Sequence, residues 1–267
     1  MSNKLLDFDL NKSTIVLAGS FQGVGLELAK LLVSCNANLL LIGRTKKKAI
    51  NAIKLLKSIN PSANVQYQLY DLYVKKNRVG LSKSIKKKYP KGINHLVSFI
   101  GTGKTPFGTN VNIAEWKEVF EKNFFSVVDL VNLCLPSLKK SKKNNSIIIT
   151  SSVAGLERLS APQSYSCSKA ALSSYVPHLA NDLSKENIRV IGINPGNIYF
   201  KNGRWEQIIK KQGMKKIKKN ILSKVSMKRF GLANEIAWTY LMALSPKNSF
   251  MTGSNITVDG QQVNKTI

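Results

Sequence analysis

Short apolar segments rich in Val, Ile and Leu alternate with longer segments of helical periodicity along this chain of 267 residues. Segments of this length and composition are typical of buried strands. We expect strands at 14–18, 38–42, 65–69, 95–100, 146–150, 189–193 and 256–258.

The segments between these strands favour helices, because their apolar residues recur every three to four positions. The first contains Leu26, Ala29, Leu32 and Val33, and the others lie at 47–59, 81–88, 113–138 and 165–183. This alternation predicts an α/β fold: a doubly wound (Rossmann) parallel sheet of about seven strands, with helices on both faces. No repeat or composition break divides the chain, so we expect residues 1–267 to form a single domain.

The composition permits one sizeable core, with 43% hydrophobic residues, and the charge is strongly basic. Lys and Arg number 41 against 14 Asp and Glu, a net charge of +27 that suits nucleic acid, anionic membranes or acidic substrates. Most of the excess is lysine and is spread through many segments, which favours solvated faces. A nucleotide-sensing or nucleic-acid-binding module on the same fold remains an alternative.

The N-terminal segment includes acidic residues and lacks an apolar run, unlike a signal peptide. No stretch has the ~20 apolar residues of a membrane-spanning helix. Cys35, Cys134 and Cys167 show no disulfide or C-x-x-C spacing. We therefore expect a cytoplasmic protein with no metal site.

A glycine-rich turn between the first strand and the first helix has the form G-x-x-x-G-x-G. Such glycines allow the backbone to approach a diphosphate, whose charge the N-terminus of the helix stabilises. An ordinary glycine-rich turn is the alternative. The candidate cofactor contacts here are Gly19, Ser20, Phe21, Gly23, Val24 and Gly25.

The end of the second strand distinguishes the two nicotinamide cofactors, because an acid there would bind the ribose hydroxyls and repel a 2′-phosphate. Here Gly43 is followed by Arg44 and Thr45, with no carboxylate. The guanidinium of Arg44 suits a phosphate, so we expect NADP(H). The alternative for Arg44 is a surface cation at the start of the next helix.

Tyr165 and Lys169 are four residues apart on a predicted helix, so they lie on one face. A nearby ammonium lowers the pKa of a tyrosine, and Tyr165 is therefore a candidate proton donor and acceptor. Ser151 and Ser152 end the fifth strand, where a parallel sheet places its ligand crevice. Ser152, thirteen residues before Tyr165, is the preferred hydroxyl.

The order and spacing of these motifs resemble the short-chain dehydrogenase/reductase family, including members that act as 3-oxoacyl-[acyl-carrier-protein] reductases. The matching segments are AGSFQGVG at 18–25, Asp71, Asn123, ITSSVAG at 149–155, YSCSK at 165–169, NPG at 194–196 and MTGSNITVDG at 251–260. The resemblance covers nearly the whole chain. It implies transfer of a hydride between nicotinamide and a ketone or secondary alcohol, in a homotetramer or homodimer.

By this resemblance, Tyr165 is the general acid/base, Ser152 orients the carbonyl, and Lys169 binds the nicotinamide ribose and tunes Tyr165. Asn123 holds a water that links Lys169 to solvent. The remaining implied cofactor contacts are Asp71 and Leu72 at the adenine, Gly101, and Pro195, Gly196 and Ile198 beside the nicotinamide.

The resemblance also implies a substrate lid at about 197–231. We expect Tyr199, Phe200 and Trp205 to wall an apolar pocket and Lys201 and Arg204 to attract an anionic group. The spacing of apolar residues across 214–225 predicts an amphipathic, basic helix. The candidate substrates are a 3-oxoacyl thioester and a sugar or sugar-nucleotide ketone, including anionic and carrier-linked forms. We expect neither a membrane nor a specific nucleic acid as a partner.

The family's usual N-N-A-G after the fourth strand is replaced by Ser98-Phe99-Ile100-Gly101. We expect the bulky Phe99 and Ile100 to crowd the adenosine ribose and to change how the cofactor packs.

Overall fold

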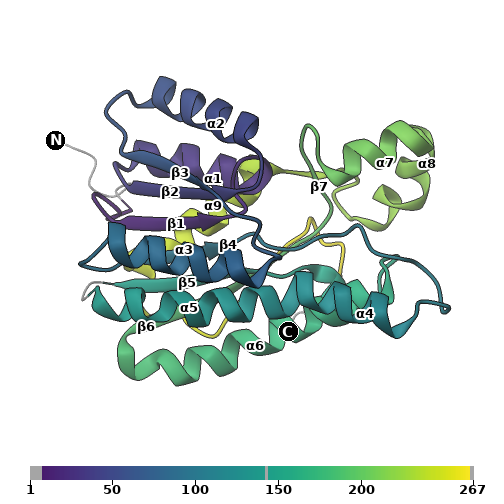
Figure 1. The fold of residues 1–267 in the computed structure, drawn as a ribbon. Helices are drawn as coiled ribbons and strands as arrows, with labels where there is room; N and C mark the ends of the chain where they lie inside the picture. Colours follow the sequence, from purple (N-terminus) through teal and green to yellow (C-terminus); the bar gives the residue numbers. More distant parts are fainter. Residues whose placement is uncertain (1–7, 142–143, 265–267) are drawn as a thin grey trace.

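The computed structural model describes residues 8–141 and 144–264, so the N-terminal segment discussed above lies partly outside the described residues. Seven parallel strands form one sheet in the order β3-β2-β1-β4-β5-β6-β9, which confirms the predicted doubly wound fold (Figure 1). The strands are β1 (Thr14–Ala18), β2 (Asn38–Gly43), β3 (Val65–Leu69), β4 (His95–Ser98), β5 (Asn145–Thr150), β6 (Ile188–Pro195) and β9 (Asn255–Val258).

Helices cover both faces of the sheet (Figure 1). One face packs against α1 (Gly23–Ser34), α2 (Lys46–Ile59) and α9 (Ala233–Leu244). The other packs against α3 (Lys75–Lys88), α5 (Ser126–Lys140) and α6 (Gln163–Leu183). Each layer encloses its own cluster of fully buried apolar side chains, because the strands are apolar on both faces.

The chain reverses direction across the sheet between β1 and β4, which lie side by side although β2, β3 and their helices separate them in sequence. Parallel sheets of this kind bind ligands outside the carboxyl ends of their strands at such a reversal. The segments that follow β1 and β4 therefore meet at the expected place for a cofactor.

Several predicted boundaries differ from the structure. The strand predicted at 95–100 ends at Ser98, because the chain turns away before Ile100. The helix predicted at 113–138 is divided into α4 (Ile113–Phe120), a π-helical turn at Glu121–Phe125 and α5. A π-turn is a single wide turn inserted into an α-helix, and its few residues are too short a segment for a periodicity argument to resolve. The buried helix α9 was also missed.

Residues 198–232 form a separate small unit beside the sheet, at the right of Figure 1. It contains β7 (Ile198–Tyr199), α7 (Arg204–Gln212), α8 (Met214–Asn220), a 3₁₀ turn at Leu222–Lys224 and β8 (Gly231–Leu232), which pairs with β7. Its own core consists of Ile217, Leu222 and Phe230. The single helix predicted across 214–225 is therefore shorter, although its apolar and basic faces are as expected.

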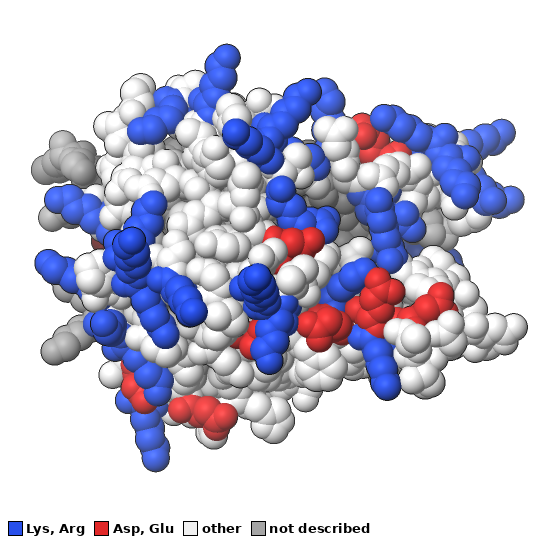
Figure 2. All heavy atoms as spheres, in the orientation of Figure 1, with Lys and Arg blue, Asp and Glu red and all other residues white. Residues whose placement is uncertain are grey.

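Basic side chains are distributed over the visible face of the molecule and are dense on the unit that holds α7 and α8 (Figure 2). Acidic side chains lie between them in a few places (Figure 2). Among the described residues, no helix is both long and apolar enough to span a bilayer.

Candidate active site

A cavity of about 400 Å³ lies at the carboxyl ends of β1, β2 and β4. Ten of the residues proposed for cofactor binding line it: Gly19, Phe21, Gly23, Val24, Gly25, Arg44, Thr45, Asp71, Leu72 and Gly101. Ser20 does not line it, because its hydroxyl is buried and donates a hydrogen bond to the carbonyl of Leu17 (2.8 Å). The Ser20 side chain therefore supports the turn from beneath.

The glycine-rich turn has the shape that a nucleotide diphosphate needs. Gly19 and Gly23 adopt positive φ angles of 87° and 60°, which side chains disfavour. A Cβ atom at Gly25 would lie 2.7 Å from the Cα of Ser20, so the close approach of helix and turn requires glycine. The first turn of α1 contains no acidic residue. The residues of this turn thus fit a dinucleotide at the start of α1.

Gly43 is required by packing as well as by the chemistry of the cofactor. A Cβ atom there would lie within 2.3–2.9 Å of the ring of Phe21. The Phe21 ring packs edge-on against Tyr67, with 6.3 Å between ring centroids. A larger side chain at position 43 would displace Phe21, so the absence of an acid here also has a structural cause.

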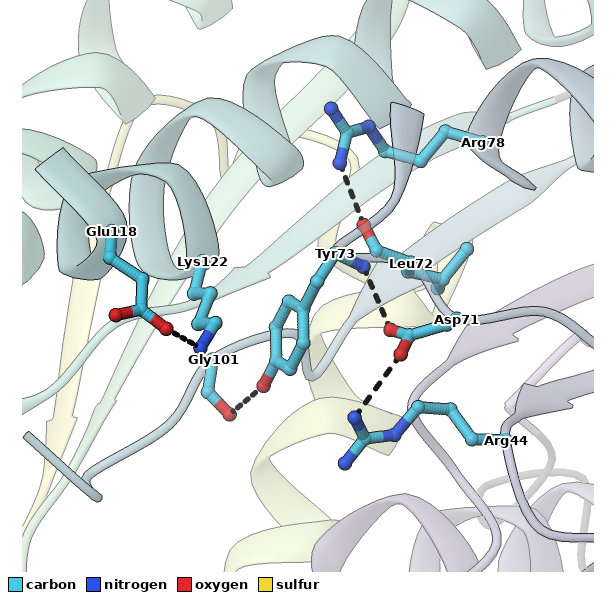
Figure 3. Close-up of polar contacts among 8 residues, drawn as sticks. All are labelled: Arg44, Asp71, Leu72, Tyr73, Arg78, Gly101, Glu118 and Lys122. Atoms are coloured by element: carbon cyan, nitrogen blue, oxygen red, sulfur yellow. Dashed lines mark hydrogen bonds and ion pairs between the residues drawn. The ribbon is translucent and has the colours of Figure 1, made fainter. Parts of the chain in front are cut away.

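Arg44 lies at the mouth of the cavity and is held there by two contacts (Figure 3). Its Nη1 lies 3.3 Å from Oδ2 of Asp71, and its guanidinium lies over the ring of Tyr73 at 5.3 Å from the centroid. The Arg44 side chain is 60% exposed, so the pair is screened by water and weak. Arg44 is oriented towards the nucleotide site and is available to a stronger anion.

Tyr73 joins the segment after β3 to the segment after β4 (Figure 3). Its hydroxyl donates to the carbonyl oxygen of Gly101 (2.9 Å), and its backbone N–H donates to Asp71. Lys122, which also pairs with Glu118, lies 5.9 Å from the centre of the ring. Burial raises the pKa of Tyr73, and Arg44 lowers it in part.

The side chains that line the nucleotide cavity but were not among the predicted cofactor contacts include Lys48 and Phe200. Lys48 lies in the first turns of α2 and donates to the side chain of Gln22. The ring of Phe200 lies 2.9–3.1 Å from the position of a Cβ atom on Gly23, so it packs directly on the glycine-rich turn. Lys48 belongs to the run of three lysines at 46–48, which is a local signal for an anion site beside Arg44. No local pattern indicated that Phe200 would reach this cavity.

A second cavity, of about 330 Å³, brings Ser152 and Tyr165 together. The backbone N–H of Ala154 donates to Oγ of Ser152 (3.2 Å), which fixes that hydroxyl at the end of β5. Ser151 points into the protein, where its hydroxyl donates to the carbonyl of Lys169 (2.7 Å). Of the two serines, Ser152 is therefore the one that faces the cavity.

Lys169 is only 3% exposed, and its ammonium donates to the carbonyl oxygen of Thr150 (2.9 Å). Burial disfavours the charged form and lowers the pKa of Lys169 to about 8. A lysine with such a pKa loses its proton near the top of the physiological range, so its charge depends on pH.

Tyr165 differs from the sequence-based expectation of a lowered pKa. Its pKa is raised by burial, and the hydrogen bond with Ser152 lowers it only in part. The expectation relied on the ammonium of Lys169, which in this structure is directed to the carbonyl of Thr150. Tyr165 is consequently protonated at neutral pH, the state required of a proton donor.

Asn123 lies fully buried in the π-helical turn and faces the same region. Its Oδ1 accepts a hydrogen bond from the backbone N–H of Thr102 (2.7 Å), while its Nδ2 has no partner among the described residues. A Cβ atom on Gly101 would lie 2.9 Å from this Oδ1 and 3.1 Å from Nζ of Lys169. Asn123 and Lys169 therefore converge on Gly101, where only glycine leaves room for both.

A buried arginine holds the π-helical turn in place. Arg78 of α3 is 3% exposed; it pairs with Glu121 (3.1 Å) and Asp129 (2.6 Å) and donates to the carbonyl of Leu72 (2.9 Å). Removing one partner of a buried pair is costly. Arg78 thus connects the nucleotide side of the site to the segment that contains Asn123.

The predicted pocket walls are only partly correct. Trp205 and Arg204 line the cavity of Ser152, together with the predicted nicotinamide neighbours Gly196 and Ile198. Phe200 belongs to the nucleotide cavity. Tyr199 packs on Phe230 in the small core of residues 198–232 (6.1 Å between ring centroids). Lys201 and Pro195 line neither cavity; Lys201 is exposed and Pro195 is the last residue of β6.

Phe99, which we expected to crowd the adenosine ribose, contributes to the core as well as to the nucleotide cavity. Its ring packs on Tyr240 in the core, with 4.9 Å between ring centroids. Its backbone lies 3.4 Å from the position of a Cβ atom on Gly19. Phe99 and Ile100 both border the nucleotide cavity, but the partly buried ring of Phe99 also packs against the core.

The family model of the short chain dehydrogenases matches residues 13–207. The 3-oxoacyl-[acyl-carrier-protein] reductase of Chlamydia muridarum is 27% identical over 253 residues, covering 94% of this chain and 97% of that protein. The structure of L-sorbose reductase from Gluconobacter frateurii, complexed with NADPH and L-sorbose, is similar with a TM-score of 0.88 and 24% identity, covering 98% of this chain and all of that one.

A 7α-hydroxysteroid dehydrogenase complexed with NADH and 7-oxo glycochenodeoxycholic acid is similar with a TM-score of 0.85 and 25% identity, covering 97% of each chain. These similar structures thus hold different nicotinamide cofactors and different carbonyl compounds. The choice of cofactor and substrate must be argued from the residues of this chain.

Proposed function

Because this chain belongs to the short-chain dehydrogenase family, we propose that it is an NADP(H)-dependent oxidoreductase that interconverts a ketone and a secondary alcohol. The observation that carries the proposal is the convergence of Ser152 and Tyr165 on one cavity, beside a buried Lys169 and next to the nucleotide cavity. A binding module on this fold would not require that arrangement.

Tyr165 is proposed as the general acid, because its raised pKa keeps the proton that a ketone oxygen must receive. Ser152, fixed by the N–H of Ala154, orients the same oxygen. The bound nicotinamide supplies or accepts the hydride. Lys169 stabilises negative charge that develops on Tyr165, and it binds the ribose through an ammonium held near Thr150.

Asn123 is proposed to hold a water that returns protons from solvent towards Lys169. Its buried Nδ2 is a donor without a partner among the described residues, whereas its Oδ1 is fixed by Thr102. A water on Nδ2 would satisfy this donor, which is otherwise costly to bury. Gly101 keeps the space between Asn123 and Lys169 free of a side chain.

NADP(H) is proposed over NAD(H) because Arg44 and Lys48 are the two cationic side chains that line the nucleotide cavity. Arg44 is already oriented by Asp71 and Tyr73. The guanidinium is exposed and its ion pair with the half-buried Asp71 is weak, so a phosphate with two negative charges would compete for it.

The substrate classes remain 3-oxoacyl thioesters and sugar or sugar-nucleotide ketones. We also propose a single domain with residues 197–231 as a lid, a cytoplasmic location, and a homodimer or homotetramer. Exposed apolar side chains support an association between copies; they include Phe125 on the π-turn, and Trp238 and Met242 on α9.

The proposal is tested by mixing purified protein and NADPH with panels of ketones from both classes and following NADPH absorbance. We expect turnover with at least one class, and about a hundredfold less with Tyr165→Phe. Lys216→Gln, an exposed change on α8, is the control. Equal rates in Tyr165→Phe and the control would contradict the assignment of Tyr165.

A further inference from the structure

The cavity of Ser152 and Tyr165 does not end at the catalytic residues but continues outward along the lid. A neighbouring cavity of about 550 Å³ shares much of its wall with the cavity of about 330 Å³. The shared apolar wall includes Phe107, Trp205, Ile208 and Ile221, and the shared charged residues are Arg204 and Lys224. We call the two cavities together the substrate cleft.

The substrate cleft contains cations but no carboxylate. No Asp or Glu is among the lining residues of either cavity, whereas Arg204 and Lys224 line both. Neither of these two side chains forms an ion pair or a hydrogen bond with any residue that the structure describes. They come from two different segments, the start of α7 and the 3₁₀ turn after α8.

The nearest carboxylates along the chain are already engaged. Glu206 accepts from the N–H of Asn202 and pairs with Lys210. Glu235 holds Arg229 through two hydrogen bonds of 2.8 Å, and the pKa of Glu235 is lowered to about 2 mainly by this contact. The charge of Arg204 and Lys224 therefore remains unbalanced at an apolar wall.

We propose that Arg204 and Lys224 bind an anionic group, a carboxylate or a phosphate, carried by the ketone substrate itself. The inference rests on the proposed function, because the carbonyl would lie at Ser152 and Tyr165 while an apolar body spans Trp205 and its neighbours. Arg204 and Lys224 are both exposed, so the binding energy comes from two cations acting together and from the apolar side chains beside them rather than from loss of water. The guanidinium of Arg204 also provides paired donors for a carboxylate or phosphate.

The test compares a keto acid having an apolar spacer with its methyl ester, which has the same ketone but no charge. With the unaltered protein we expect the acid to have at least about a tenfold higher kcat/KM. Arg204→Gln and Lys224→Gln should each remove most of this preference by raising the KM for the acid, with a much smaller change in the KM for the ester. Lys216→Gln removes one positive charge from an exposed position outside the cleft and should not change kcat/KM for either substrate.

Binding is measured separately by calorimetry with Tyr165→Phe and NADPH, so the inference is tested even without turnover. Tighter binding of the acid than of the ester, lost in Arg204→Gln, supports it. Equal binding of acid and ester, or equal losses for both in the two variants, would overturn it. If no ketone is reduced but the acid still binds through Arg204, the proposed function fails and the anion site stands.

The source of the anion is distinguished by a further arm with a 3-oxoacyl coenzyme A, whose phosphates lie far from the ketone. Dependence of its KM on Arg204 and Lys224 would indicate a carrier phosphate, whereas dependence only for the free keto acid would indicate a carboxylate near the apolar body. Independence in both arms would contradict the inference.

Discussion

The proposed catalytic wall and the proposed lid are built differently, although both border the two cavities that we propose as the substrate cleft. The catalytic wall lies at the end of β5 and on α6, where Lys169 is 3% exposed and Ser151 ties the helix to the strand. In the lid, α7 has no buried residue, and the core of the lid consists of Ile217, Leu222 and Phe230. The proposed catalytic residues are thus held by the main core, and the residues that would select the substrate are held by a small separate cluster.

This difference separates two kinds of failure. Damage to the catalytic wall should affect the chemical step or the whole fold, because its side chains share hydrogen bonds and burial with the sheet. Damage to the lid should change substrate binding and leave the fold intact, because few buried contacts would be lost. The following predictions test that separation, beginning with the largest effect.

Tyr165→Phe removes the transferable proton and keeps the ring in place. We expect kcat to fall by about 10²–10⁴, the range for loss of a general acid, while the Kd for NADPH changes little. Steady-state kinetics and fluorescence titration with NADPH measure the two quantities. A variant that kept near-native kcat would show that another group donates the proton.

Leu41→Ala and Phe230→Ala compare the two cores directly. Leu41 is fully buried in the main core, so its truncation should lower the free energy of unfolding by about 2–5 kcal/mol. Phe230 belongs to the lid cluster, and its truncation should instead raise KM and expose the lid to protease, with less than about 1 kcal/mol of global loss. Denaturant titration that gave both variants the same loss would show that the lid folds with the main core.

The rate of ketone reduction should decrease as the pH is raised above about 8. Burial lowers the pKa of Lys169 to about 8, so its charge is lost first, while the raised pKa of Tyr165 keeps that hydroxyl protonated. If the charge is required, kcat/KM should fall about tenfold per pH unit above this value. An arginine at position 169 keeps its charge at this pH, so the residual activity of Lys169→Arg should not fall above pH 8. If the activity of this variant fell in the same way, the pH dependence would belong to another group.

The same titration affects stability in a defined direction. From about pH 8 towards the ordinary lysine pKa of 10.5, the unfolded chain retains the proton that folded Lys169 has lost. The contribution of Lys169 to the free energy of unfolding therefore increases with pH over this window. Lys169→Met should remove that increase, as denaturant titrations at pH 7.5 and pH 10 would measure.

Arg44→Ala should have the smallest effect and should act on one cofactor. We expect the Kd for NADPH to increase about tenfold and that for NADH to remain nearly constant, because only NADPH has the 2′-phosphate. Lys47→Ala, an exposed change on α2 outside the nucleotide cavity, is the control. Gly43→Asp is a poorer test, because its side chain would displace Phe21. Equal losses of both cofactors would contradict a phosphate role for Arg44.

Local pattern was sufficient where a feature depends on residues close in sequence. The strands of the sheet, the glycine-rich turn and the i, i+4 pair of Tyr165 and Lys169 were all evident, because each is encoded by periodicity or by a short spacing. Ser152 was preferred to Ser151 from spacing alone, and the structure directs the two hydroxyls accordingly. The π-turn at Asn123 was not evident, because it spans only five residues within a longer helical segment.

Only the tertiary structure decided which segments far apart in sequence contact one another. The pKa of Lys169 is set by burial, which no local pattern reports, and Phe200 reaches Gly23 across about 180 residues of chain. Arg204 and Lys224 lie at one cleft only because α7 and α8 fold on Phe230. The sequence by itself determined the fold and singled out the proposed reacting groups, since both follow from short-range spacing. Their protonation and the shape of the cleft depend on packing, which the complete chain must establish.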